Sequence, residues 1–167
     1  MTAVTRRPQG RRRPARPMSA CRGTVEDMDQ RISFVTLAVA DIDVTRRFYV
    51  DGLGWTPELD VPGEVIMFRA GEHLVLSLWE RSHFEDEVGA LMTGPGVAPI
   101  TIAHNLATPE AVDAVLSTAR AAGSPHVEEA VRRDWGGYTG YFADPDGFRW
   151  EIAFNPDPGL SAIVLPD

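Results

Sequence analysis

The chain has 167 residues, of which 44% are hydrophobic and 24% are charged, a composition typical of one soluble globular domain and unlike that of a disordered or fibrous protein. No apolar stretch approaches the roughly 20 residues of a membrane-spanning helix, and the single cysteine, Cys21, has no partner for an internal disulfide. We therefore expect a cytoplasmic protein with no membrane partner.

Charge is divided unevenly along the chain. Residues 1–27 carry seven arginines against two acidic residues, a net charge of +5, and the remaining residues carry nine arginines against 22 acidic residues, a net charge of −13. The basic segment has no apolar face, and we expect a disordered N-terminal tail. An arm that binds nucleic acid, a dispensable tail and codons upstream of a true start at Met18 or Met28 all fit this composition. Because the acidic remainder would repel phosphate, we expect no nucleic-acid partner.

Hydrophobic periodicity predicts a β-α-β-β-β unit in residues 31–80. An apolar, β-branched run at 32–39 predicts a strand, and Asp41 directly after it can cap a helix. Glycines at 52 and 54 are expected to end this helix. Three short strands are then predicted, at 57–61, 65–68 and 74–79.

The second half repeats this order in residues 99–156. A strand is predicted at 100–106, followed by a helix that Thr108 caps and Gly123 closes. Three strands then follow at 126–131, 138–142 and 148–154, and the tight turn Asp144-Pro145-Asp146-Gly147 joins the last two.

Equal spacing in the two halves supports a duplication. Ser77 comes nine positions after Phe68, and Glu151 comes nine positions after Phe142, so Ser77 and Glu151 are equivalent positions. The predicted fold is α+β, with two tandem βαβββ modules that form an open, cleft-lining mixed sheet. We expect one domain over residues 28–160, with a Gly- and acid-rich linker at 81–98 between the modules and a tail at 161–167.

Two segments of the chain resemble the vicinal oxygen chelate superfamily, which includes glyoxalase I, extradiol dioxygenases, fosfomycin-resistance enzymes and bleomycin-resistance binding proteins. They are residues 35–41 with Phe48-Tyr49, and residues 140–151, which contain the Asp-Pro-Asp-Gly turn. The resemblance covers about residues 31–156. It implies that the two modules line a cleft and that the protein is a homodimer.

Metal-dependent members of that superfamily place one ligand on the first strand and one on the last strand of each module. The resemblance puts these positions at Phe34, Ser77, Thr101 and Glu151, of which only Glu151 can ligate as an anion. We therefore expect no metal and no other cofactor. His104 lies three residues after Thr101, so it is expected on the opposite sheet face, packed between sheet and helix.

Strand alternation divides the last strand into a helix face, with Trp150 and Ile152, and a cleft face, with Arg149 and Glu151. Glycines 136 and 137 could let two aromatic rings fold over a ligand as a lid, or Trp135 could cover a core edge. The candidate ligand-binding residues are Phe34, Thr36, Ser77, Trp79, Thr101, Asn105, Trp135, Tyr138, Arg149 and Glu151.

A partly apolar wall with a few polar points is typical of small-molecule sites. We expect a metal-independent binding protein that takes an apolar or cationic ligand in an aromatic-lined cleft, because the acidic domain disfavours anions. Glu151 could bind the ligand, pair with Arg149 or another arginine, or act as the candidate catalytic base. The alternative function is an enzyme of the superfamily, a lyase, isomerase or dioxygenase with Glu151 as general base or with an unusual metal site.

Overall fold

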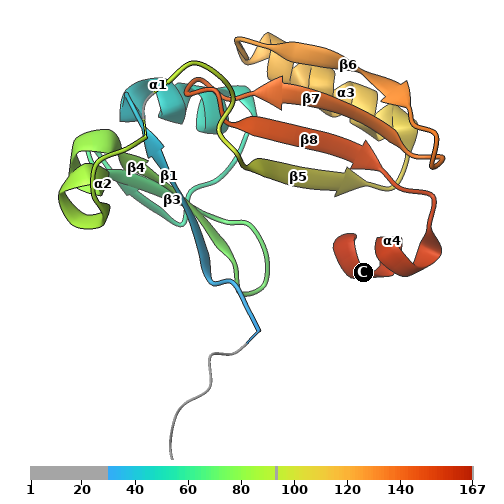
Figure 1. The fold of residues 1–167 in the computed structure, drawn as a ribbon, viewed down its shortest axis with the longest axis horizontal. Coiled ribbons are helices and arrows are strands. Elements are labelled where there is room, and N and C mark those ends of the chain that lie inside the picture. The colour runs from blue at the N-terminus through green and yellow to red at the C-terminus, as the bar shows by residue number, and fades with distance from the viewer. Residues whose placement is uncertain (1–29, 93, 167) are drawn as a thin grey trace, which may run out of the picture. The chain divides into compact units, whose positions relative to one another are not determined.

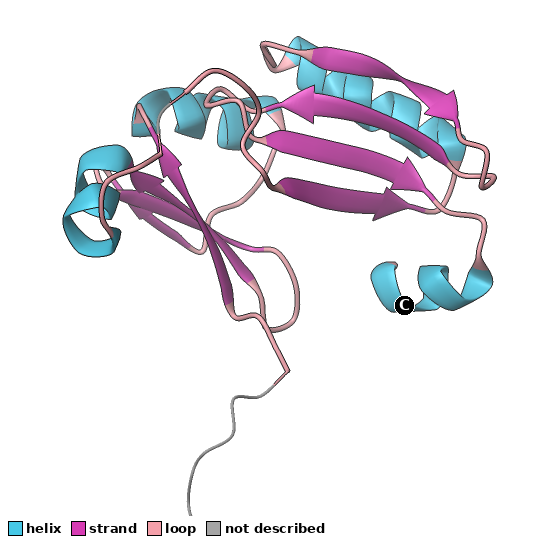
Figure 2. Ribbon diagram, viewed as in Figure 1, coloured by secondary structure: helices cyan, strands magenta, loops and turns pink. Residues whose placement is uncertain are grey.

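The computed structural model describes residues 30–92 and 94–166, and the predictions made for residues 1–27 lie outside this part of the chain. Two four-stranded sheets and their helices make up the unit Ile32–Asp167 (Figure 1, Figure 2). No helix among the described residues has the length and apolar character needed to span a membrane.

The first module follows the predicted order of elements. Asp41 caps its helix, because the carboxylate accepts hydrogen bonds from the backbone N–H groups of Asp43 at 2.9 Å and Val44 at 3.0 Å. The helix continues without a break into a π-helical segment. The elements are β1 (Phe34–Val39), α1 (Ile42–Arg46), η1 (Arg47–Gly52), β2 (Leu59–Val61), β3 (Val65–Arg69) and β4 (Val75–Glu80).

The second module has the same order, and its helix begins at the predicted cap, where the Thr108 hydroxyl accepts from the N–H of Ala111. Its elements are β5 (Thr101–Leu106), α3 (Pro109–Ala121), β6 (Val127–Arg132), β7 (Tyr138–Ala143) and β8 (Arg149–Phe154). The sheets have matching strand orders, β1-β4-β3-β2 and β5-β8-β7-β6, with the first pair parallel in each. The prediction of two βαβββ modules is therefore confirmed.

Two short helices were not predicted. Helix α2 (Arg81–Val88) occupies the first half of the expected linker, and the Glu80 carboxylate caps it by accepting from the N–H of Ser82 at 2.8 Å. Helix α4 (Pro158–Val164) begins after Asp157, which accepts from the N–H of Leu160. It extends past residue 160, where the sequence predicted the domain to end.

One hydrophobic core joins the two modules. Figure 1 shows α3 along one face of the sheet β5–β8, and the buried side chains of this helix pack in the same cluster as those of β1, η1 and β8. Gly52 of η1 lies so close to α3 that an added Cβ would sit 2.5 Å from the Cβ of Ala122. The packing leaves the opposite face of the β5–β8 sheet without this helix cover.

Candidate functional site

The face of the β5–β8 sheet that points away from α3 holds the polar candidates of the second module. Trp150 and Ile152 are buried in the core, so alternation turns Arg149 and Glu151 to the other side of β8. The strand register fixes their neighbours on that face. Arg149 is paired with Thr101 and Ala143, and Glu151 is paired with Ala103 and Tyr141.

Glu151 forms a hydrogen bond with Tyr141 across the strand pair. The Tyr141 hydroxyl donates to Oε1 of Glu151 at 3.1 Å. Burial, with the nearby negative charge of Glu151 as the next cause, raises the pKa of Tyr141, so the phenol stays protonated as a donor. No ion pair joins Arg149 to Glu151 in the part of the chain described, so the expected alternative in which those two side chains pair is not what the structure shows.

Arg149 carries an unpaired buried nitrogen. Its Nη1 atom is shielded from solvent and has no hydrogen-bond partner among the described residues. A charged donor that is buried without an acceptor is costly, and most such groups in proteins are satisfied by protein, water or a bound molecule. The arrangement therefore offers a donor to a hydrogen-bond acceptor that enters beside the Tyr141–Glu151 pair.

The candidates of the first module lie on the other sheet. Thr36 is the register partner of Ser77, and Phe34 on the same face of β1 is 54% exposed. Trp79 makes an edge contact with Phe84 of α2, with ring centroids 6.2 Å apart. Helix α2 thus covers one end of this face, which the prediction of an irregular linker did not anticipate.

The aromatic lid, one of the two alternatives considered for Trp135 and Tyr138, is not assembled in the structure. The Tyr138 hydroxyl donates to Asp113 of α3 at 2.9 Å, so this ring lies on the helix-covered face, opposite Glu151. Three residues separate Tyr138 from Tyr141, and alternation puts positions three apart on opposite faces. Trp135 is 55% exposed and folds back over Gly137, where its ring fills the space of a side-chain Cβ.

The donor set does not fit the divalent metal site of metal-dependent relatives. Of Phe34, Ser77, Thr101 and Glu151, only Glu151 supplies an anionic ligand. Residues 30–92 and 94–166 also contain no group of three or more His, Cys, Asp or Glu side chains placed to hold a metal ion.

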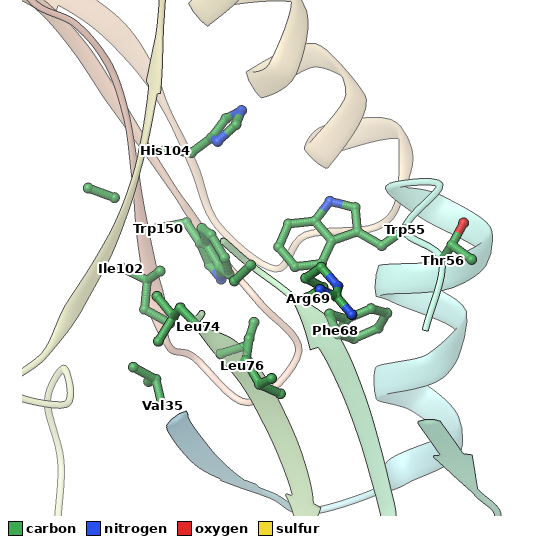
Figure 3. Close-up of a pocket in the computed structure, with 13 residues that line it drawn as sticks. Val35, Trp55, Thr56, Phe68, Arg69, Leu74, Leu76, Ile102, His104 and Trp150 are labelled. Carbon is green, nitrogen blue, oxygen red and sulfur yellow. The ribbon is translucent and has the colours of Figure 1, made fainter. Parts of the chain in front are cut away.

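A hollow of about 430 Å³ lies on the other side of these strands, and sequence reasoning missed it (Figure 3). Its walls include Trp55, Phe68, Ile102, His104 and Trp150. His104 is on the helix-facing side of β5, as predicted, but it borders this hollow instead of packing under a helix. In the sequence these residues have the pattern of ordinary core positions, so no signal distinguished the hollow from filled core.

Solved structures with the same fold come from several bacteria. A glyoxalase-related enzyme from Fulvimarina pelagi is 35% identical, with a TM-score of 0.69 over 76% of this chain and 89% of that one. A glyoxalase/bleomycin resistance protein/dioxygenase from Nocardioides is 25% identical, with a TM-score of 0.66 over 81% and 89%. A lactoylglutathione lyase from Agrobacterium tumefaciens, 23% identical with a TM-score of 0.59 over 77% and 96%, shares the fold.

Sequence comparison agrees with the structural similarity. No functionally curated protein has significant similarity to the chain. Residues 31–152, which span both modules, match the family model described as the Glyoxalase/Bleomycin resistance protein/Dioxygenase superfamily. With this match over most of its length, the chain belongs to that superfamily.

Proposed function

We propose that the protein binds a small organic molecule, without a metal, on the face of the β5–β8 sheet that carries Arg149 and Glu151. The observation that carries this proposal is the buried, unpaired Nη1 of Arg149 on the same face as the Tyr141–Glu151 hydrogen bond. A pocket with few polar groups in an otherwise apolar wall sets the orientation of its ligand through those groups.

The polar groups define the ligand's chemistry. Glu151 accepts hydrogen bonds and carries negative charge, so it suits an amine or hydroxyl group of the ligand. Arg149 donates, so it suits a carboxylate or another acceptor. The strands on either side of β8 present small side chains beside them, Ala103 next to Glu151 and Ala143 next to Arg149. This set extends the sequence-based expectation of an apolar or cationic ligand by adding an acceptor for the arginine.

A thermal-shift screen of small amino, hydroxy and carboxylic acids tests this function, with calorimetry on each compound that stabilises the protein. We expect compounds that carry both a donor and an acceptor to bind wild type, and Arg149→Met and Glu151→Gln to weaken binding at least about 10-fold each, the effect of losing one charged hydrogen bond. Arg120→Gln is the matched control, since Arg120 pairs with Glu129 on the surface. Equal affinity in all four proteins would contradict the proposal.

A separate measurement tests whether the protein binds a metal. Elemental analysis of protein purified without chelator is expected to find well under one equivalent of Zn, Ni, Mn or Fe, because the donor set supplies one anionic ligand. A stoichiometric metal that co-purifies with wild type and is lost in Glu151→Gln would overturn this part of the proposal.

A second candidate function is catalysis with Glu151 as general base. The Tyr141 hydroxyl holds the Glu151 carboxylate in position on this sheet face through a 3.1 Å hydrogen bond, and the Fulvimarina pelagi relative is called a glyoxalase-related enzyme. Any ligand found in the screen is incubated with the protein and followed by mass spectrometry. Turnover that Glu151→Gln abolishes while binding persists would favour the enzyme, and an unchanged ligand would favour the binding protein.

We also propose that the chain forms a homodimer through the uncovered sheet faces. Large apolar side chains are exposed there: Phe34 on β1 is 54% exposed, and Val131, the register partner of Thr139, is 47% exposed. Light scattering after gel filtration is expected to give twice the chain mass for wild type and a lower mass for Phe34→Asp with Val131→Asp. A wild-type monomer at micromolar concentration would contradict the dimer.

A further inference from the structure

The hollow between the two modules lies on the other side of β5 and β8 from the proposed site, and Ala103 of the edge strand β5 borders both. Ile102 and Trp150 border it, and both point to the opposite side of their strands from Thr101 and Glu151. Leu74 and Leu76 close it from the first module. Its volume of about 430 Å³ falls within the range of sites that hold small organic molecules.

Aromatic rings form the floor of this hollow. Trp55 meets Trp150 edge to face, with ring centroids 5.5 Å apart and planes at 90°, and it meets Phe68 at 5.2 Å and 82°. Figure 3 shows the two indole rings beside one another, with Ile102, Leu74 and Leu76 gathered on one side of them. Edge-to-face clusters of this kind leave ring faces and edges that pack well against another planar ring.

The polar side chains among the described residues that line the hollow are Thr56, Arg69 and His104, together with two indole N–H groups. The indole N–H of Trp150 already donates to the Tyr49 hydroxyl at 3.0 Å. The His104 ring and the indole N–H of Trp55 have no hydrogen bond to any described residue, so both remain available to a ligand. Burial lowers the pKa of His104, so near neutral pH the imidazole is uncharged, with one nitrogen that donates and one that accepts.

Among the described residues that line the hollow, the charged side chain is Arg69, and its charge is already compensated. Arg69 forms an ion pair with Glu58, with 2.8 Å between Nε and Oε1. The rest of the folded part is strongly acidic by sequence, which disfavours an anionic ligand. An uncharged molecule therefore suits the hollow better than an anionic one.

We propose that this hollow is a second ligand site, which takes an uncharged planar aromatic molecule with a hydroxyl or carbonyl group directed to His104 and Trp55. The ring system packs against Trp55 and Trp150, and the polar group exchanges a hydrogen bond with the imidazole. This site does not depend on Arg149 or Glu151, and its occupant differs in charge from the ligand proposed for the sheet face.

The test uses 2-naphthol as the probe and 2-naphthoate as its charged counterpart. Binding is measured by calorimetry and by shifts of the four tryptophan indole N–H signals in ¹H–¹⁵N spectra. We expect 2-naphthol to bind wild type and to shift the Trp55 signal while the Trp135 signal stays fixed. Naphthoate is expected to bind several-fold more weakly. His104→Ala is expected to weaken naphthol binding about 3- to 10-fold, the effect of one hydrogen bond.

Two filling variants and one matched control locate the site. Ile102→Trp and Leu74→Trp each place a large ring in the hollow and are expected to abolish naphthol binding. Thr101→Trp puts the same ring on the next residue of β5, on the face of Arg149, and is expected to leave naphthol binding unchanged. If Ile102→Trp fails to fold by circular dichroism, Leu74→Trp decides the result.

Three results would overturn the second site: no naphthol binding to wild type at millimolar concentration, binding that survives in the folded filling variants, or loss of binding in Thr101→Trp. The last result would assign the probe to the sheet face and so would favour the proposed function alone. Failure of the acid screen together with naphthol binding that the filling variants abolish would leave the second site standing by itself.

Discussion

The hydroxyl of Tyr49 donates a 2.9 Å hydrogen bond to the carboxylate of Asp144, which lies 95 residues later in the chain, in the other module. The same hydroxyl accepts from the indole N–H of Trp150 at 3.0 Å, and Tyr49 is completely buried. Asp144 also accepts from the backbone N–H groups of Asp146 and Phe148. The Asp-Pro-Asp-Gly turn therefore joins the modules as well as two strands.

A second carboxylate of that turn strengthens the junction. Asp146 accepts from the backbone N–H of Ala40 at 2.7 Å, directly before α1 of the first module. Arg81 lies 3.9 Å away and adds a weak electrostatic attraction. The motif that identifies the family in the sequence thus has a structural task in this chain, and the ligand binding that we propose depends on Arg149 and Glu151, which follow it.

Tyr49→Phe is expected to destabilise the protein by about 1–3 kcal/mol, because it leaves Oδ2 of Asp144 and the indole N–H of Trp150 without their hydrogen-bond partner. Urea unfolding measures the effect. Tyr138→Phe removes a hydroxyl that bonds to Asp113 at the surface and is expected to cost less than about 1 kcal/mol. If both variants lost a similar free energy of unfolding, the buried hydrogen bonds of Tyr49 would stabilise the protein no more than the surface hydrogen bond of Tyr138.

Stability is expected to depend on the protonation of Asp144. Burial raises its pKa from 3.8 to about 6. The native state therefore holds this proton more tightly than the unfolded chain, and the contribution to stability is complete below about pH 4 and is lost as the pH rises to about 6. The linked free energy is as much as about 3 kcal/mol.

Asp144→Asn is the variant that isolates this dependence. The free energy of unfolding of wild type minus that of Asp144→Asn is expected to fall between about pH 4 and about pH 6.5. Carboxylates with lowered pKa values, such as Asp60 beside Arg46, act in the opposite direction but are common to both proteins, so they cancel in the difference. A difference that stays flat over this pH range would show that folding does not raise the pKa of Asp144.

The sequence predicted the modules well because the signals for them are local. Asp41 and Thr108 are helix caps that act within three residues, and alternation assigned Trp150 and Glu151 to opposite faces of one strand. The lid alternative put Tyr138 on the wrong face of the sheet. It rested on the neighbouring glycines and did not take account of the alternation of side chains along the strand. Helix α2 was missed because its residues are polar on nearly all sides, which leaves no apolar stripe to detect.

The hollow and the unpaired arginine could not be predicted, because both depend on contacts between distant segments. Trp55 and Trp150 meet across the two modules, and no periodicity relates them. That Arg149 forms no ion pair with Glu151 or with another carboxylate of the described residues follows from side-chain positions on the assembled sheet. Strand alternation predicted the face on which Arg149 lies, but it could not predict which group the guanidinium would bond to.

Gly140→Ala is expected to destabilise the protein by about 1–3 kcal/mol through overpacking. A Cβ at this position would lie 2.6 Å from Cδ1 of Leu116 on α3 and 2.9 Å from the backbone oxygen of Glu128, which cannot move aside easily. Gly94→Ala is the control, since a Cβ there meets nothing within 4 Å. Thermal unfolding of both variants checks this, and equal melting temperatures would show that α3 shifts to accommodate the methyl group.

Arg149→Met is expected to leave the unliganded protein as stable as wild type, or to stabilise it by about 1 kcal/mol, although it weakens ligand binding. The reason is that wild type buries Nη1 without an acceptor, and an apolar side chain of similar length removes that desolvation cost. A site kept for binding often lowers stability in this way. Urea unfolding in the absence of ligand makes the measurement.

Arg46→Met is the control variant for this measurement. Arg46 holds the carboxylates of Asp43 and Asp60 together beside α1, so its removal is expected to destabilise the protein by up to about 1 kcal/mol. If Arg149→Met instead lost several kcal/mol, the guanidinium would be satisfied in solution by water or by a second chain, and the argument that its free nitrogen waits for a ligand would fail.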